Sequence, residues 1–237
     1  FFFKQKTAYE MLGGDISQAR VPAAALEIIH TYSLIHDDLP GMDNDDYRRG
    51  RLTNHKVFGE GFAILAGDGL LNYAYECILK NALDYGANLE GHILAAREIA
   101  QRAGVGGMVA GQSIDLLSEH REPNEATLHY IHMHKTADLL TAPLLAAAYI
   151  AGADEKSIAA LRTFGACVGL AFQIDDDLLD VMGDAKDLGK QTGMDEQRGK
   201  MTWPSLVGVE AAQKKSRELW IQAEEALAVF GDSAWFL

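Results

Sequence analysis

The sequence predicts an all-α fold, a bundle of helices whose acidic sites point inward. Two observations predict it. Apolar residues recur at helical spacing along nearly the whole chain, and convincing alternating strands are absent. Two aspartate clusters are also set into otherwise apolar helical stretches, an arrangement typical of sites built inside helical bundles.

The expected helices follow one another with short breaks between them. In order, they cover residues 23–36, 61–83, 89–103, 105–118, 124–150, 155–182 and one or two segments within 204–230. Proline lacks the amide donor and disrupts a helix, so the Pro40–Gly41 pair breaks the first helix and Pro143 kinks the fifth. Asn124 caps the fifth helix. A basic loop, 47–51, follows the first helix, and a lysine-bearing loop, 184–200, follows the sixth.

Composition bounds the class of protein. The chain has 237 residues, 48% of them hydrophobic and 23% charged, so it can bury a sizeable core. No linker or low-complexity tract divides it, and we expect a single domain over 11–237. The net charge of −13 argues against general binding of nucleic acid or anionic membranes, which requires a basic face. Diphosphates are not excluded, because local arginines and lysines can reverse the sign.

Cysteine usage and apolar runs indicate the compartment. Cys77 and Cys167 are isolated and lack metal-type spacing, which fits a reducing cytoplasm. The longest apolar run, 139–153, contains a proline and is shorter than the roughly 20 residues that span a bilayer, so no transmembrane segment is expected. Residues 1–10 lack an initial methionine and the order of a signal peptide, and we expect a foreign or disordered leader.

The two acidic clusters are Asp37, Asp38 and Asp43, and Asp176, Asp177 and Asp180. Asp43 lies too far from Asp37 for one uninterrupted helical turn, but a bulge at Pro40–Gly41 can return it to the cluster. In the second cluster, residues three and four apart share a helix face, so all three carboxylates lie close together.

Crowded carboxylates beside an apolar surface repel one another and lose hydration, which raises their pKa values unless a positive charge lies among them. A hard divalent cation is the simplest remedy, and magnesium prefers a few carboxylates together with waters and substrate phosphates. The clusters therefore predict metal ions that grip a diphosphate from two sides. A solvated acidic surface is the alternative, which the surrounding Leu, Ile and Phe residues disfavour.

Basic residues near the clusters extend the diphosphate hypothesis. Guanidinium groups match phosphate oxygens bidentately, so Arg48 and Arg49 are candidates for a clamp, although such residues are usually exposed ion-pair partners. Lys135, Lys190 and Lys200 would neutralise a leaving diphosphate, although each alone is more often a surface charge.

Two further patterns receive an ordinary interpretation. The glycine-rich stretch 104–111 lacks the Gly-Lys-Ser/Thr ending of a phosphate loop, and close helix packing explains it better. His129, His132 and His134 do not share one helix face, which favours a surface histidine group over a zinc site.

These motifs together resemble a known family. Residues 27–50 are similar to the first aspartate-rich motif of trans-prenyltransferases (polyprenyl synthetases), and residues 172–180 are similar to the second. Further matches in order and spacing are Gly111-Gln-x-x-Asp115, Lys135-Thr136, Leu188-Gly-Lys190 and Gly199-Lys-x-Thr202. The resemblance covers the chain from about Met11 to Phe230.

The resemblance implies the isoprenoid synthase helical bundle with a central active-site cavity, a homodimer, and three magnesium ions per site. Metal binding falls to Asp37, Asp38, Asp43, Asp176, Asp177 and Asp180. A direct role in catalysis falls to Asp37, Asp38, Arg48, Lys135, Thr136, Gln173, Lys190 and Lys200. Within this set, the allylic diphosphate is held by Arg48, Lys135, Gln173, Lys190 and Lys200. Thr136 and Gln173 face the developing cation, and His30 and Arg49 contribute to the isopentenyl diphosphate site.

The implied reaction condenses isopentenyl diphosphate with dimethylallyl or geranyl diphosphate. Tyr32 precedes the first cluster and would form a floor beneath the growing chain, as in bacterial-type farnesyl diphosphate synthases. A geranylgeranyl diphosphate synthase is the alternative. An inactive partner subunit of such a synthase is a second alternative. It is disfavoured because such subunits tend to lose aspartates of the two clusters, and this chain retains all of them. A class I terpene cyclase is disfavoured by Asp180, because cyclases usually carry an Asn/Ser/Glu motif in place of the second cluster.

Two departures from the family predict a chain truncated at both ends. The family's Gly-Gly-Lys-Arg-x-Arg-Pro segment would precede Met11 and is absent, and the chain stops at Leu237 without the usual basic ending. The missing segment supplies a lysine and an arginine to the isopentenyl diphosphate site, so we expect weak binding of that substrate.

Overall fold

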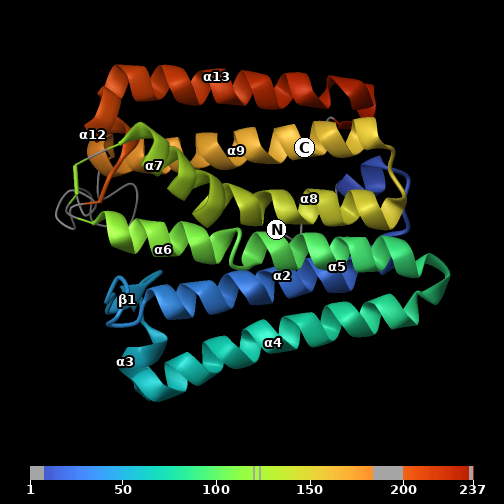
Figure 1. Ribbon diagram of the computed structural model, residues 1–237, viewed down its shortest axis with the longest axis horizontal. Coiled ribbons are helices and arrows are strands. Elements are labelled where there is room, and N and C mark those ends of the chain that lie inside the picture. Colours follow the sequence, from blue (N-terminus) through green and yellow to red (C-terminus); the bar gives the residue numbers. More distant parts are fainter. Residues whose placement is uncertain (1–7, 120, 123, 184–199, 235–236) are drawn as a thin grey trace. The chain divides into compact units, whose positions relative to one another are not determined.

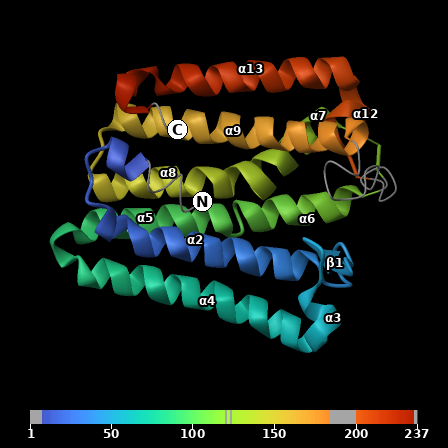
Figure 2. The ribbon, with the colours of Figure 1, turned by 180° about the vertical axis from the view of Figure 1, so that it is seen from behind.

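The computed structural model describes residues 8–119, 121–122, 124–183, 200–234 and 237 (Figures 1 and 2). Helices dominate this part of the chain, which confirms the all-α prediction. Its only strands within those ranges are β1 (Tyr47–Arg48) and β2 (Arg51–Leu52), which pair antiparallel. The basic loop predicted over 47–51 is therefore a short hairpin.

The described residues fall into two compact units. The first contains the described residues up to Ile99 together with Ala146–Gly152, and the second contains the described residues of Ala100–Leu145 and those from Ala153 onward. The prediction of a single domain over 11–237 stays a prediction.

The first unit is built on two long helices that lie side by side, α2 (Ile16–Asp37) and α4 (Glu60–Asp84) (Figures 1 and 2). A close approach near the first cluster depends on Gly67 of α4, because a Cβ there would collide with the His36 ring. The unit also contains α3 (Asn54–Phe58), η1 (Gly86–Asn88) and most of α5 (Leu89–Ala103).

The start of α2 differs from the predicted one. The helix begins at Ile16 because the Asp15 side chain caps it, accepting a hydrogen bond from the Ser17 N–H at 3.0 Å. Pro22, which the predicted range avoids, lies inside the helix. α2 ends at Asp37, so the first cluster lies at its carboxyl terminus.

The second unit is built on α9 (Glu155–Met182), which packs along α13 (Val209–Leu227) (Figures 1 and 2). Its other elements are α6 (Met108–Ser118), α7 (Glu125–Ile131), η2 (His132–Ala137), the first part of α8 (Asp138–Ala151), α12 (Trp203–Val207) and η3 (Ala228–Ala234). Gly208 separates α12 from α13 with a φ of 85°, a conformation that favours glycine.

The predicted helix 124–150 is interrupted by η2, which is a π-helix. Two glycines of neighbouring helices pack against it. A Cβ on Gly111 of α6 would collide with the backbone of Lys135, and a Cβ on Gly169 of α9 would collide with the last residue of η2. The wide turn, of a kind often found at functional sites, therefore fits because both neighbours lack side chains.

One helix in the described ranges, α9, contains an 18-residue window that could cross a bilayer by length and composition, and half of that window is buried inside the protein. The core helix of a globular protein passes the same test. At the amino terminus, Ala8 and Tyr9 of the predicted leader are helical and buried. Residues 1–7 of the leader lie outside the described residues.

Candidate functional site

An ion pair between Asp38 and Arg48 dominates the first cluster. Asp38 is only 3% exposed. The Arg48 guanidinium donates from Nε to both carboxylate oxygens, at 2.8 and 3.0 Å, and from Nη2 to Oδ1 at 2.6 Å. These bonds raise the pKa of Arg48, although its partial burial opposes them. Two residues that the sequence assigns to the diphosphate site therefore bind each other in this structure.

The bulge predicted at Pro40–Gly41 is present. The Asp43 N–H donates to the Asp37 carbonyl at 2.9 Å, and the Asn44 N–H donates to the Leu39 carbonyl at 3.1 Å. Asn44 adopts a φ of 51°, which asparagine tolerates better than most residues. The turn brings the backbone of Asp43 back to that of Asp37, as the first-cluster hypothesis requires.

The β1–β2 hairpin positions Arg48. Its two-residue loop, Arg49-Gly50, has positive φ at both positions, 52° and 75°, as a type I′ turn requires. Thr53 closes the base, since its hydroxyl donates to the Asp45 carbonyl at 2.7 Å. Arg49 itself is exposed at the tip. In the sequence, the Arg49-Gly50 pair is the local signal for this hairpin, because glycine readily adopts a positive φ.

Tyr32 and His30 lie on α2 ahead of the cluster. Tyr32 is 7% exposed, and its ring meets His36 edge-on with a centroid distance of 5.7 Å. Burial raises the pKa of Tyr32 to about 12. Burial also lowers the pKa of the half-buried His30, because the charged imidazolium loses hydration. Tyr32 is therefore a neutral, buried ring near the first cluster.

The second cluster belongs to a hydrogen-bonded chain that crosses two elements. Asp177 is 3% exposed. Its Oδ1 accepts from Gln173 Nε2 at 3.3 Å, and Gln173 Oε1 accepts from the Thr136 hydroxyl at 2.8 Å. The structure thus joins three of the predicted site residues, although Thr136 lies on η2 and the others on α9. Asp180 is buried and Asp176 is half-buried.

Asp175 precedes these aspartates and has a different role. It accepts hydrogen bonds from the Ser216 hydroxyl at 2.5 Å and from Trp220 Nε1 at 3.0 Å, both on α13. Asp175 therefore ties α9 to α13. The predicted ligand set omits Asp175.

Lys135 pairs with a second motif residue. Its Nζ donates to Asp115 Oδ2 at 2.6 Å, and both side chains are largely buried. Asp115 lies on α6, one helical turn beyond Gly111, whose missing side chain lets η2 approach. Lys200 is half-buried beside the Thr202 cap of α12. Lys190 lies outside the described residues.

The interpretation of the three histidines as a surface group is wrong for His132. This residue is 4% exposed, and burial lowers its pKa to about 3. Its Nδ1 accepts a hydrogen bond from Trp203 Nε1 at 3.0 Å. His134 instead bonds Asp138 at 2.7 Å. The partner of His132 lies 71 residues away, so no local pattern could have revealed it.

The carboxylates suit magnesium better than a transition metal. Among the described residues, no three His, Cys, Asp or Glu side chains converge to hold a metal ion by themselves. Each cluster would instead supply one or two hard oxygen ligands, and water and phosphate oxygens would complete the coordination. Magnesium is bound in this way, whereas structural zinc requires a closed set of protein ligands. The donor set therefore fits magnesium.

Comparison with known proteins gives a consistent result. The sequence model described as polyprenyl synthetase matches residues 5–228. Geranylgeranyl pyrophosphate synthase 9, chloroplastic, of Arabidopsis thaliana is 46% identical over 231 residues. The match covers 95% of this chain but only 63% of that relative, so the chain spans less than two thirds of its length.

Two solved structures are similar over nearly the whole chain. An FPP/GFPP synthase from Zymomonas mobilis matches with a TM-score of 0.87 and 33% identity, covering 98% of this chain and 78% of that one. A geranyltransferase from Helicobacter pylori, complexed with magnesium and isoprenyl diphosphate, matches with a TM-score of 0.83 and 30% identity, covering 97% and 77%.

Proposed function

Because the chain belongs to the polyprenyl synthetase family, we propose that it is a prenyl diphosphate synthase, which joins isopentenyl diphosphate to an allylic diphosphate. Its fold is the isoprenoid synthase fold. One observation carries the proposal: the hydrogen-bonded chain from Thr136 through Gln173 to Asp177. This chain joins the Lys-Thr motif to the second aspartate-rich motif, so two motifs that are far apart in the sequence act on the same place.

We assign the aspartates of both clusters to magnesium diphosphate. Bound magnesium would stabilise the negative charge that builds on the departing diphosphate. Lys135 would add a positive charge, and its position is fixed by Asp115. Preorganised charges of this kind lower the barrier because they need no rearrangement as the reaction proceeds.

The bond changes follow from this charge distribution. The allylic carbon–oxygen bond breaks, and its electron pair leaves with the diphosphate. The double bond of isopentenyl diphosphate then supplies the electron pair of the new carbon–carbon bond, and the product cation loses a proton to the departed diphosphate. The oxygens of Thr136 and Gln173, which lie 2.8 Å apart, supply partial negative charge for the developing cation.

Two product lengths are supported. The buried ring of Tyr32 supports farnesyl diphosphate, because an aromatic floor would stop the chain early. The name of the Arabidopsis relative supports geranylgeranyl diphosphate at least as well. The Zymomonas structure is named an FPP/GFPP synthase.

One assay tests the proposal. The protein is supplied with magnesium, labelled isopentenyl diphosphate, and dimethylallyl, geranyl or farnesyl diphosphate, and the products are sized. We expect linear prenyl diphosphates that require both substrates. A cyclic hydrocarbon formed without isopentenyl diphosphate would indicate a cyclase. No turnover with any of the three primers would indicate an inactive partner subunit.

We also propose that the protein forms a homodimer through α4. Large apolar side chains recur on its exposed side at helical spacing, where Phe62 is 71% and Leu83 is 76% exposed. Others on this side are Leu65, Tyr73 and Leu79. Exposed apolar side chains gathered on one side of a helix are typical of interaction sites.

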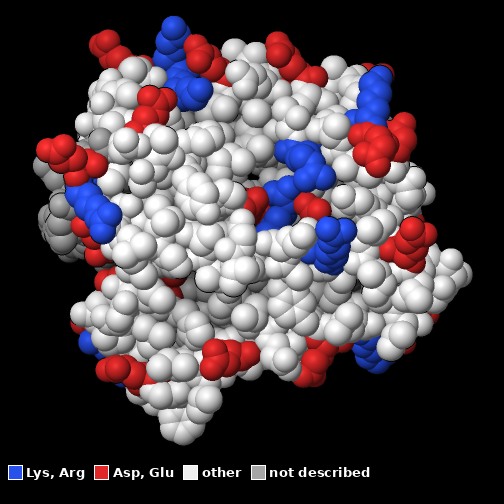
Figure 3. Space-filling model, in the orientation of Figure 1, with Lys and Arg blue, Asp and Glu red and all other residues white. Residues whose placement is uncertain are grey.

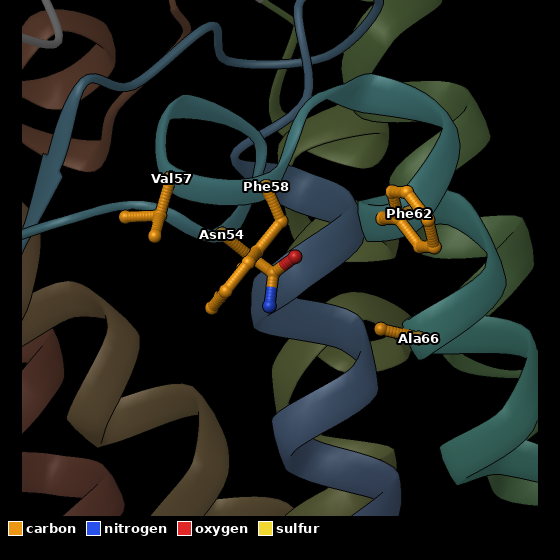
Figure 4. Close-up of a pocket in the computed structure, with 5 residues that line it drawn as sticks. All are labelled: Asn54, Val57, Phe58, Phe62 and Ala66. Carbon is orange, nitrogen blue, oxygen red and sulfur yellow. The ribbon is translucent and has the colours of Figure 1, made fainter.

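The surface continues onto α3. Asn54, Val57 and Phe58 line a pocket together with Phe62 and Ala66 of α4 (Figure 4). In Figure 3 the surface over α3 and the start of α4, at the lower left, is mainly uncharged. A second copy is the expected occupant. Sedimentation should show a dimer that Leu65→Glu disrupts and that Lys214→Glu, at an exposed position on α13, does not. A wild-type monomer would refute the proposal.

A further inference from the structure

Trp203, at the start of α12, donates two hydrogen bonds, one to the imidazole of His132 and one to the carboxylate of Asp177. Its indole Nε1 donates to His132 Nδ1 at 3.0 Å. Its backbone N–H donates to Asp177 Oδ2 at 2.9 Å. His132 Nε2 lies 3.6 Å from the same oxygen. All three residues are buried.

The indole determines which nitrogen of His132 carries the proton. An indole N–H can only donate, so His132 Nδ1 must present its lone pair to Trp203. In a neutral imidazole the proton then resides on Nε2, the nitrogen that faces Asp177. At 3.6 Å this contact is longer than a hydrogen bond, but the N–H dipole points its positive end toward the carboxylate.

We propose that His132 and Trp203 are positioning residues, which orient the Asp177 carboxylate before magnesium diphosphate binds. The inference rests on the proposed function and deepens it. Gln173 holds the other oxygen, Oδ1, at 3.3 Å. The carboxylate is therefore directed from α12, from η2 and from within α9, so its rotamer is set by three elements. Partners that orient metal-binding groups in this way are needed for full metal affinity.

Two substitutions remove different parts of the network. Trp203→Phe keeps the ring and the backbone N–H but removes the indole donor. His132→Asn can still accept from Trp203, because its side-chain oxygen replaces Nδ1, but it is too short to reach Asp177. His132→Gln places an amide N–H near the position of Nε2 and should restore function partly.

Trp220→Phe is the matched control. Trp220 also donates its indole N–H to a carboxylate of α9, at 3.0 Å, but the acceptor is Asp175. Trp220→Phe therefore also removes an indole donor from a carboxylate, but that carboxylate, Asp175, directly precedes the proposed metal ligands Asp176 and Asp177. Trp220→Phe should weaken the contact between α9 and α13 and leave magnesium activation unchanged.

The first readout requires no substrate or metal. Nitrogen-15 shifts of labelled histidine should show His132 as the Nε2–H tautomer in the wild type and a mixture of tautomers in Trp203→Phe. An Nδ1–H tautomer in the wild type would overturn the proposal, whatever the activity of the protein.

The second readout is the magnesium concentration that gives half-maximal turnover. Trp203→Phe and His132→Asn should raise it about tenfold, His132→Gln less, and Trp220→Phe not at all. Equal values for folded Trp203→Phe and Trp220→Phe would refute the positioning role. If a His132 variant does not fold, the comparison of Trp203→Phe with Trp220→Phe decides whether the positioning role holds. If the wild type makes no product, the proposed function has failed, and calorimetry with magnesium and inorganic diphosphate makes the same comparison.

Discussion

Gly111 of α6 lies directly against the backbone of Lys135 in η2, so closely that a methyl group on Gly111 would collide with the Lys135 nitrogen. Gly111→Ala should therefore displace η2. We expect overpacking to lower the free energy of unfolding by about 1–3 kcal/mol. Turnover should fall by up to about 100-fold, since small misplacements of catalytic groups cost that much. Urea denaturation and steady-state kinetics measure both effects. Gly106→Ala, where a Cβ meets nothing within 4 Å, is the control, and identical behaviour of the two variants would contradict the packing argument.

Arg48→Ala should destabilise the first unit. It removes the guanidinium from the buried carboxylate of Asp38, and hydrogen bonds to charged groups contribute about 1.5–3 kcal/mol. Arg51→Ala changes the same hairpin at an exposed position and should have little effect in urea denaturation. If the Arg48 and Arg51 variants unfold at the same urea concentration, the ion pair does not stabilise the protein.

Tyr32→Ala should lengthen the product. The variant removes the ring that would stop the growing chain, while Tyr32→Phe keeps the ring and should keep the product length. Because the ring is buried, the alanine variant should also lose roughly 3–5 kcal/mol of stability. Product sizing at a temperature where both variants are folded tests the floor. An unchanged product length in Tyr32→Ala would show that Tyr32 does not limit the growing chain.

Asp175 and Asp176 should separate stability from catalysis. Asp175→Ala leaves Ser216 and Trp220 without their acceptor, at an expected cost of about 1–3 kcal/mol, and should leave the magnesium dependence unchanged. Asp176→Asn should lower turnover roughly 100-fold through the loss of a charged ligand with little change in melting temperature. The reverse pattern would show that the ligand set is misassigned.

Alkaline pH should destabilise the protein partly through Tyr32. Its pKa rises from 10.0 to about 12 on burial, so the folded state favours the neutral phenol. The stabilisation is complete below pH 10 and is lost as the pH rises from 10 to 12, by up to roughly 2–3 kcal/mol. Tyr32→Phe should therefore flatten the fall of stability over this range. The exposed Tyr47 provides the control, and an equal slope for Tyr47→Phe and Tyr32→Phe would contradict this account.

The sequence predicts those features of the fold that depend on local periodicity. α4, α5 and α9 lie close to their expected ranges because their apolar residues recur at helical spacing. The predicted first helix begins at residue 23, whereas α2 begins at Ile16 behind its Asp15 cap and contains Pro22. The hairpin was missed because two-residue strands carry no pattern, although Arg49-Gly50 provided a turn signal.

The remaining features depend on contacts between distant residues. The π-helix arises where Gly111 and Gly169 let two helices approach η2, and nothing within residues 132–137 reveals it. The sequence similarly places Arg48 near the first cluster but gives no sign that it binds Asp38. Chemistry-bearing residue types were predictable because the motifs are local, whereas their partners were not.

Three consecutive aspartates on α9, residues 175–177, read as one acidic run but occupy three separate environments. Successive residues of an α-helix are rotated by about 100°, so the three side chains point in different directions. Asp175 accepts a hydrogen bond from α13, and Asp177 accepts one from α12. Asp176 is half-buried. Each position can therefore change under its own selective pressure. A descendant of this protein could replace Asp175, Ser216 and Trp220 by an apolar contact and remain an enzyme. A substitution of Asp177 would also require a compensating change in α12, whose backbone donates to that carboxylate.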